Sequence, residues 1–211
     1  MGISSLTCAA ATRRACVFLD RDGVINEDVF YPRTGEWEAP LAPCDLVLRP
    51  GVLPALRRLQ ALGFMLVLVS NQAAFAKGKV PLADLMAVHD RFANILTDAG
   101  IAFTEFCYSY SHPSGVVPGF SGPSLERKPG IYFPIAVAAR HDLALERSWM
   151  VGDRDTDILC GRNAGVTTIL VANPRAGEHA GKIDPDFRAT DLMEAVDIIA
   201  RHVQNQALNR A

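Results

Sequence analysis

Short apolar runs alternate along this chain with segments whose apolar residues recur at helical spacing. The apolar runs predict strands at residues 16–19, 64–69, 102–109, 149–152 and 167–171. Helical spacing is found at residues 52–62, 81–99, 131–141 and 157–164. Continuous apolar runs are typical of strands buried on both faces, and strand–helix alternation is typical of a parallel sheet. We therefore predict an α/β fold, a Rossmann-like parallel sheet with helices on both faces.

Two segments interrupt this alternation. Residues 27–49 are rich in proline, glycine and acidic residues, and we expect them to form a flap over the end of the first strand. Residues 111–126 contain three prolines and three glycines, which predicts a loop. Long loops in compact domains often carry function. Because neither segment is large enough for a second domain, we expect a loop-only, minimal cap over an open site for a small substrate.

The chain length and composition fit one globular unit. Of the 211 residues, 49% are hydrophobic, which is enough for one sizeable core. We expect a single domain at residues 15–204, a disordered tail at residues 1–14 and a second tail at residues 205–211. No apolar stretch reaches the length of a transmembrane span. We expect a monomer with no membrane partner.

Charge and cysteine usage narrow the kind of partner. The net charge of −2 and the pI near 6.2 argue against binding to nucleic acid or to an anionic membrane. Any positive potential must then be local, as in a phosphate pocket. The five cysteines contain no Cys-x-x-Cys pair, which is typical of reduced thiols in a cytoplasmic protein.

The candidate chemistry begins where the first apolar run ends, at Asp20 and Asp22, followed by Gly23. The carboxyl ends of parallel strands are where open α/β sheets bind ligands. Two neighbouring carboxylates repel each other unless a cation lies between them, and carboxylates hold Mg²⁺ together with substrate phosphate. Taken alone, this pattern also fits a polar turn without a ligand.

Three further polar segments stand beside predicted strands and helices. They are Ser70-Asn71-Gln72, Arg127-Lys128-Pro129-Gly130 and Asp153-Arg154-Asp155-Thr156-Asp157. Together with the first motif, and in this order, they resemble the four signature motifs of haloacid-dehalogenase-type phosphatases. Within that superfamily, residues 15–171 are similar to the branch that contains the D-glycero-D-manno-heptose 1,7-bisphosphate phosphatases and the histidinol-phosphate phosphatases.

The resemblance implies a catalytic set. Asp20 is then the nucleophile that forms an aspartyl-phosphate, and Asp22 is the general acid and base. The implied cofactor is Mg²⁺, bound by the carboxylates of Asp20 and Asp153 and by the backbone carbonyl of Asp22. Ser70 and Lys128 are expected to donate to the phosphoryl oxygens.

The resemblance also implies a substrate-binding set. Arg127 is a recognition position whose guanidinium group can bind a second phosphate or a sugar hydroxyl, and Arg154 replaces the lysine usual in the family. The expected substrate contacts are Asp28, Val29, Phe30, Tyr31, Ser70, Asn71, Gln72, Ala73, Arg127, Lys128 and Arg154. The turn at residues 73–75 reads Ala-Ala-Phe where the family often has Ser-Gly-Ile, so this wall of the site is more apolar.

Several of these residues also fit structural roles. Taken singly, Arg127 and Lys128 fit solvated surface charges, and Ser70 fits a turn or a helix cap. Asp155 and Asp157 fit the first turn of a helix, where aspartate is favoured. We predict this structural role for Asp155, whereas for Asp157 a supporting role behind the site is an alternative. The five histidines lack metal-binding spacing, and none is assigned to catalysis.

The function that the resemblance implies is a Mg²⁺-dependent phosphomonoesterase. It would remove the 7-phosphate of heptose 1,7-bisphosphate on the route to nucleotide-heptose and surface polysaccharide. Histidinol-phosphate phosphatase is the alternative within the enzyme class. A phospho-accepting module of the receiver type is the alternative from another class, but such modules lack an acid/base residue at the position of Asp22.

One metal of the family is not expected. Many relatives bind structural zinc through Cys-x-His and Cys-x-Cys on the loop before Arg-Lys-Pro. At these two places the chain has Ser109-Tyr110-Ser111 and Ser124-Leu125-Glu126. Serine hydroxyls are poor Zn²⁺ ligands, and Cys107, His112 and Glu126 together supply fewer than the usual four. We therefore predict that the protein binds no zinc.

Overall fold

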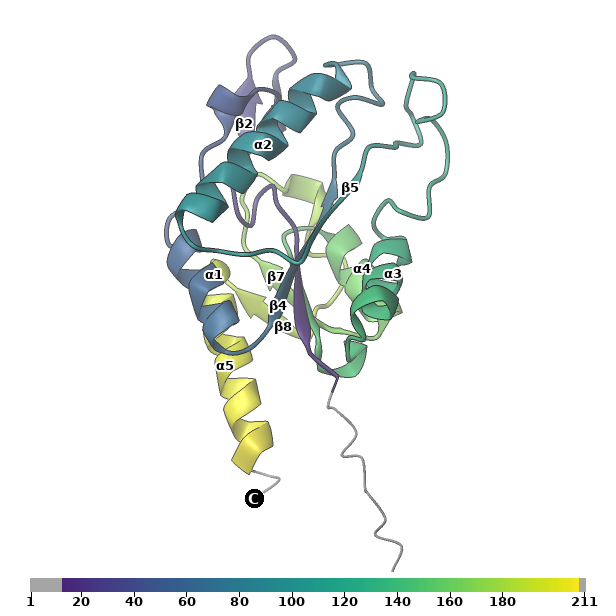
Figure 1. Cartoon of the computed structure of the whole chain (residues 1–211). Helices are drawn as coiled ribbons and strands as arrows, with labels where there is room; N and C mark the ends of the chain where they lie inside the picture. The colour runs from purple at the N-terminus through teal and green to yellow at the C-terminus, as the bar shows by residue number, and fades with distance from the viewer. Residues whose placement is uncertain (1–12, 209–211) are drawn as a thin grey trace, which may run out of the picture.

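A computed structural model describes residues 13–208 of the chain (Figure 1). Its centre is a sheet of six parallel strands in the order β5-β4-β1-β6-β7-β8. The strands are β1 (Cys16–Leu19), β4 (Met65–Asn71), β5 (Glu105–Ser109), β6 (Trp149–Gly152), β7 (Thr167–Val171) and β8 (Phe187–Ala189). The parallel α/β fold is confirmed, and all five predicted strands are present.

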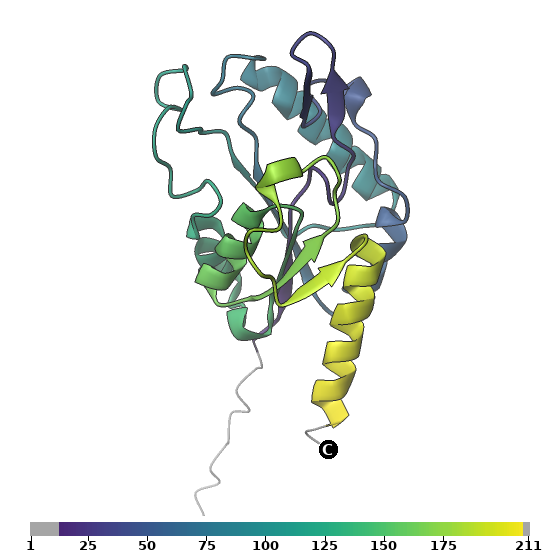
Figure 2. The ribbon, with the colours of Figure 1, turned by 180° about the vertical axis from the view of Figure 1, so that it is seen from behind.

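Helices cover both faces of this sheet (Figures 1 and 2). One face carries α1 (Val52–Ala61), α2 (Leu82–Asp98) and α5 (Leu192–Leu208), and the other carries α3 (Tyr132–His141) and α4 (Asp155–Ala164). Three short 3₁₀ helices are η1 (Pro43–Asp45), η2 (Leu145–Arg147) and η3 (Gly177–His179). Neither α5 nor β8 was predicted. The Phe-Arg-Ala sequence of β8 is too short to show strand periodicity.

The central strand β1 shows why continuous apolar runs predict this fold. Val17 and Leu19 belong to the core beneath α1, α2 and α5, whereas Cys16 and Phe18 belong to the core beneath α3. All four side chains are completely buried. Because successive side chains of a strand point to opposite faces, a strand covered on both faces must be apolar throughout.

The predicted flap contains a small antiparallel hairpin, formed by β2 (Val29–Tyr31) and β3 (Glu36–Glu38). The Tyr31 hydroxyl donates a 2.6 Å hydrogen bond to Asp45 and accepts one of 2.8 Å from the Leu41 amide, which fixes the hairpin to the following segment. Residues 111–126 contain no helix or strand, as predicted. The cap is therefore a hairpin and loops, and not a separate domain.

The structure moves both predicted tail boundaries. Residues 1–12 and 209–211 lie outside the described part. Arg14 forms a bridge with Leu143, so the ordered fold begins before residue 15. Helix α5 continues to Leu208, beyond the predicted boundary at 204, and Gln206 and His202 are hydrogen-bonded one turn apart within it. None of the helices in residues 13–208 is long and apolar enough to cross a membrane.

Candidate active site

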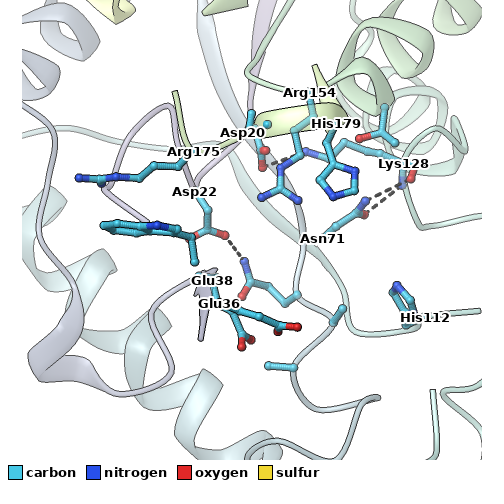
Figure 3. Close-up of a pocket in the computed structure, with 18 of the residues that line it drawn as sticks. Asp20, Asp22, Glu36, Glu38, Asn71, His112, Lys128, Arg154, Arg175 and His179 are labelled. Carbon is cyan, nitrogen blue, oxygen red and sulfur yellow. Dashed lines mark hydrogen bonds and ion pairs between the residues drawn. The ribbon is translucent and has the colours of Figure 1, made fainter. Parts of the chain in front are cut away.

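The predicted motifs converge where β1, β4 and β6 reach their carboxyl ends (Figure 3). Asp20 follows β1, Asn71 ends β4 and Asp153 follows β6, while Lys128 comes from the segment before α3. A cavity of about 730 Å³ opens at this edge of the sheet, and Asp20, Asn71 and Lys128 line it. The fold thus assembles one polar site from segments that are far apart in the sequence.

Lys128 is the central cation of this site. Its ammonium group lies 2.8 Å from Oδ1 of Asp20 and 2.7 Å from Oδ1 of Asp157, and it donates a 2.6 Å hydrogen bond to the Val69 carbonyl. Lys128 is only 2% exposed. Although burial opposes its charge, Asp157 and Asp20 raise the pKa of Lys128 above its ordinary value. Lys128 is therefore a buried, protonated partner of Asp20 and not a surface charge.

Asp157 combines the two roles that its sequence position left open. Its carboxylate accepts a 3.0 Å hydrogen bond from the Arg154 amide at the start of α4, and it also pairs with Lys128. The residue is completely buried. A side chain on Gly152 would overlap this carboxylate, so the close approach requires glycine. Asp157 therefore anchors the helix and positions the lysine.

Asp20, Asp153 and Asp157 bring carboxylate oxygens within 4.8 Å of one another, the one such trio of potential metal ligands in residues 13–208. Burial, opposed by Lys128 and reinforced by the charges of Asp157 and Asp22, raises the pKa of Asp20 to about 6. Burial and the neighbouring aspartates raise the pKa of Asp153 well above its ordinary value. Oδ1 of Asp153 is buried without a hydrogen-bond partner. A hard divalent cation would neutralise this excess charge, so the residues fit Mg²⁺.

Asn173, in the loop after β7, orients the proposed metal ligand. Its side-chain amide donates a 2.8 Å hydrogen bond to Oδ2 of Asp153 and another of 2.8 Å to Oδ2 of Asp28. Both carboxylates are buried. The amide thus fixes one oxygen of Asp153 and leaves the other available to a cation.

Gly23 is required at this point for two reasons. Its φ of +81° lies in the left-handed region, and a Cβ atom there would overlap Oδ2 of Asp153 and Nδ2 of Asn173. We expect Gly23→Ala to destabilise the protein by more than the roughly 1 kcal/mol cost of a left-handed alanine and to lower phosphatase activity. Gly35→Ala is the matched control, because Gly35 has a φ of +69° and open space around it. Thermal unfolding and phosphate release measure both effects, and equal losses in the two variants would contradict the prediction.

Asp22 is held by three donors from different parts of the site. Arg21 Nε lies 3.2 Å and Asn26 Nδ2 3.0 Å from Oδ1, and Gln72 Nε2 lies 2.5 Å from Oδ2. Burial alone would raise the pKa of Asp22, but the charge of Arg21 and the hydrogen bonds outweigh it and hold the pKa below its ordinary value. The carboxylate is therefore ionised before substrate binds.

The motif at the end of β4 holds Lys128 and Ser70 in place. The Asn71 side chain donates to the Lys128 carbonyl at 3.1 Å and accepts from its amide at 3.0 Å. The Ser70 hydroxyl accepts a 2.9 Å hydrogen bond from Gln72. Ser70 is 1% exposed, and its own hydroxyl proton remains available for a phosphoryl oxygen.

The predicted substrate residues fall into two groups. Those that line the cavity are Asn71, Gln72, Ala73, Arg127, Lys128 and Arg154. The buried Asp28 and Ser70, and Val29, Phe30 and Tyr31 of β2, are not among the lining residues. The partner strand β3, in contrast, lines the cavity along its whole length. The flap therefore faces the cavity with its second strand, and contacts between β2 and substrate stay a prediction.

Several residues at the site were not predicted. Arg21 is buried against Asp22, and its guanidinium group lies 5.6 Å from the centre of the Tyr108 ring. Arg175 lies 4.2 Å above the Trp37 ring and 2.6 Å from Glu27. The position of Arg21 between Asp20 and Asp22 could have indicated a buried ion pair from sequence alone. Arg175 was harder to predict, since only its place just beyond the carboxyl end of β7 indicates a role at the site.

Asp155 lies in the first turn of α4, as predicted. Its carboxylate also accepts hydrogen bonds of 2.9–3.2 Å from the amides of residues 181–183, and so holds the loop after β7 against the start of this helix.

The serines at the family's zinc positions differ in their surroundings. Ser109 is completely buried, and the Ser124 hydroxyl accepts a 3.3 Å hydrogen bond from the Glu126 amide. Within the described chain, Cys107, His112 and Glu126 do not form a trio with ligand atoms in mutual reach. That the protein binds no zinc stays a prediction, and elemental analysis tests it.

Comparisons with known proteins show the family of this chain. A HAD-hydrolase-like family model matches residues 126–195. A D-glycero-D-manno-heptose-1,7-bisphosphate 7-phosphatase of Thermosynechococcus vestitus is 39% identical over 199 residues, which cover 90% of this chain and 97% of the relative. A D-glycero-beta-D-manno-heptose-1,7-bisphosphate 7-phosphatase of Mesorhizobium japonicum is 30% identical, over 88% of this chain and 83% of the relative.

A solved structure extends the comparison to the fold. The crystal structure of the D,D-heptose 1,7-bisphosphate phosphatase from B. bronchiseptica, complexed with magnesium and phosphate, superposes with a TM-score of 0.71 at 27% identity. The match covers 89% of this chain and 99% of the other. The chain belongs to the HAD-like hydrolases and is a phosphatase. Within that class, the relatives named above are heptose 1,7-bisphosphate phosphatases.

Proposed function

We propose that the protein removes the 7-phosphate of D-glycero-D-manno-heptose 1,7-bisphosphate through an aspartyl-phosphate intermediate. The observation that carries this proposal is Asp20 paired with the buried Lys128, beside the free carboxylate oxygen of Asp153. The names of the relatives support the substrate. A soluble, cytoplasmic monomer is the form we propose.

The side chains supply the steps of a two-stage displacement. A carboxylate oxygen of Asp20 attacks phosphorus while the bond from phosphorus to the sugar oxygen breaks, and Asp22 gives that oxygen a proton. Arg21 and the hydrogen-bond donors keep the pKa of Asp22 low before substrate binds. The negative charge of a bound phosphate raises the pKa of a neighbouring carboxyl, so Asp22 takes up this proton from solvent when the substrate binds. Asp22 then takes a proton from water, whose oxygen attacks phosphorus and releases Asp20. Lys128 and the Ser70 hydroxyl stabilise the charge on the phosphoryl oxygens.

Mg²⁺ would be held by the carboxylates of Asp20 and Asp153 and by the backbone carbonyl of Asp22. When bound, it supplies positive charge to the phosphoryl group and offsets the repulsion between phosphate and the acidic strand ends. Both oxygens of Asp157 are already engaged, Oδ1 by Lys128 at 2.7 Å and Oδ2 by the Arg154 amide at 3.0 Å, so Asp157 is the least available of the three clustered carboxylates.

We expect chelation with EDTA to abolish the activity of the enzyme. The substitution Asp153→Asn should weaken the affinity of the enzyme for Mg²⁺ by about tenfold or more. The amide keeps the size of the side chain but loses the ligand charge. Activity measured against Mg²⁺ concentration gives the shift. Asp155→Asn is the matched control, since that carboxylate binds loop amides and not the cation site. Full activity after exhaustive chelation would contradict the metal requirement.

The preference for a bisphosphate rests on two guanidinium groups in the cavity. Arg127 and Arg154 both line it, and burial together with the charge of Arg154 lowers the pKa of Arg127. Like charges placed near each other favour an anion between them. A second phosphate of the substrate would supply that anion.

A phosphate-release panel tests the function. It compares both anomers of heptose 1,7-bisphosphate with histidinol phosphate and fructose 1,6-bisphosphate. We expect one heptose bisphosphate anomer to give the highest kcat/KM. A higher kcat/KM for histidinol phosphate would overturn the substrate assignment, and a stable phosphoprotein without phosphate release would favour a receiver-like module.

A further inference from the structure

We propose that Lys77 and His112, together with Arg127, form an anion subsite that binds the substrate's second phosphate. This inference rests on the proposed function and adds two residues, from loops outside the four motifs, to the guanidinium groups of Arg127 and Arg154. All three residues line the catalytic cavity. In Figure 3, His112 lies apart from the group formed by Asp20, Arg154 and Lys128, on the side of the cavity away from the nucleophile.

Three separate segments supply this subsite. Lys77 belongs to the turn after β4, His112 to the long loop after β5, and Arg127 to the segment before α3. The Arg127 guanidinium donates a 3.2 Å hydrogen bond to the carbonyl of Ser111, the residue next to His112. This hydrogen bond ties the arginine directly to the loop that carries the histidine.

His112 presents a donor to the cavity. Its Nδ1 accepts a 3.0 Å hydrogen bond from the Ser114 amide, so the proton of the neutral ring must be on Nε2. Burial and the positive charges of Arg127 and Lys77 lower the pKa of His112, which agrees with a neutral ring. A neutral imidazole that donates through Nε2 adds a hydrogen bond without adding further repulsion.

Among the residues that the structure describes, no carboxylate is in direct contact with the cations of the subsite. Within the described chain, Lys77, His112 and Arg127 form no ion pair with a carboxylate within 4.0 Å. Glu36 and Glu38 of the facing hairpin share Lys79, which lies 2.8 Å from the first and 2.6 Å from the second. Two cations and one donor without a counter-ion fit a phosphate dianion.

The two loops are fixed to each other, so the subsite is formed before substrate binds. The Ala76 carbonyl accepts hydrogen bonds of 2.7 Å and 3.2 Å from the amides of Val116 and Val117. The rings of Phe75 and Phe120 pack edge to face with centroids 4.9 Å apart. Phe75 belongs to the apolar Ala-Ala-Phe turn in which this chain departs from the family pattern.

The test compares a substrate with a second phosphate and one without it. The variants are Lys77→Met, His112→Phe and His112→Gln, and the probes are heptose 1,7-bisphosphate and p-nitrophenyl phosphate. For the bisphosphate we expect Lys77→Met and His112→Phe to raise KM by about 10- to 100-fold, the range for a lost charge-assisted hydrogen bond, with kcat little changed. For p-nitrophenyl phosphate we expect no change in either parameter.

Two controls separate binding from folding. His112→Gln keeps an N–H donor and should restore most of the affinity that His112→Phe loses. Arg91→Met removes an exposed cation of α2 that does not line the cavity, and it should leave the ratio of the two KM values unchanged. An equal rise in KM for both probes, or no rise for either, would contradict the proposed subsite. If the wild-type enzyme itself does not prefer the bisphosphate, the proposed function fails first and independently of these variants.

Discussion

Asp20→Asn is expected to release no phosphate from any substrate of the panel. The amide has nearly the same shape as the carboxylate, but it is a poor nucleophile and cannot form the acyl phosphate. Because Lys128 keeps its contacts with Asp157 and with the Val69 carbonyl, the variant should fold normally. Loss of activity therefore reports on chemistry and not on unfolding.

The measurement is phosphate release under saturating Mg²⁺, with thermal unfolding as the check on folding. Asp22→Asn is the comparison, because removal of an acid/base group slows a reaction by about 10²–10⁴-fold without abolishing it. We expect residual turnover in Asp22→Asn and none in Asp20→Asn. Phosphate release at the wild-type rate by a folded Asp20→Asn protein would contradict the aspartyl-phosphate mechanism.

The parts of this protein that could be predicted from sequence carry their signal locally. The strand β1 is covered on both faces, so it reads as a continuous apolar run, and Asp20 follows it directly. The loop at residues 111–126 is similarly evident from its prolines and glycines. In each case one short stretch of sequence determines one structural feature.

The parts that could not be predicted depend on contacts between distant segments. Asn173 is recognisable as a ligand-orienting residue only when Asp153 and Asp28 are beside it in the fold. The pairing of Asp157 with Lys128 likewise cannot be predicted from the residues next to either of them. The flap was predicted without its hairpin, since its two strands of three residues each are too short to show alternation.

Lys128→Met is expected to abolish activity and also to cost about 3–5 kcal/mol of unfolding free energy, the range for removing one partner of a buried ion pair. Lys128 and Asp157 are almost fully buried, and Asp20 and Asp153 lie in the same acidic cluster. Without the ammonium group these carboxylates lose their main neutralising charge. Lys79→Met is a close control, because Lys79 also pairs with two carboxylates, at 2.8 and 2.6 Å, but is 22% exposed and pairs with the largely exposed Glu36. Solvent screens the charges around Lys79, so Lys79→Met should lose much less unfolding free energy than Lys128→Met.

The pH dependence of Lys128→Met provides an independent check. Burial raises the pKa of Asp20 and of Asp153 even in the wild type, where Lys128 lowers that of Asp20. Without the lysine, the folded protein should bind protons more readily than the unfolded chain, so its stability should rise as the pH falls from 7 towards 5. Denaturant unfolding in EDTA at several pH values measures this slope, and added Mg²⁺ should recover part of the lost free energy by supplying positive charge. A Lys128→Met protein as stable as Lys79→Met at pH 7, with no such slope, would show that the buried lysine does not neutralise the acidic cluster.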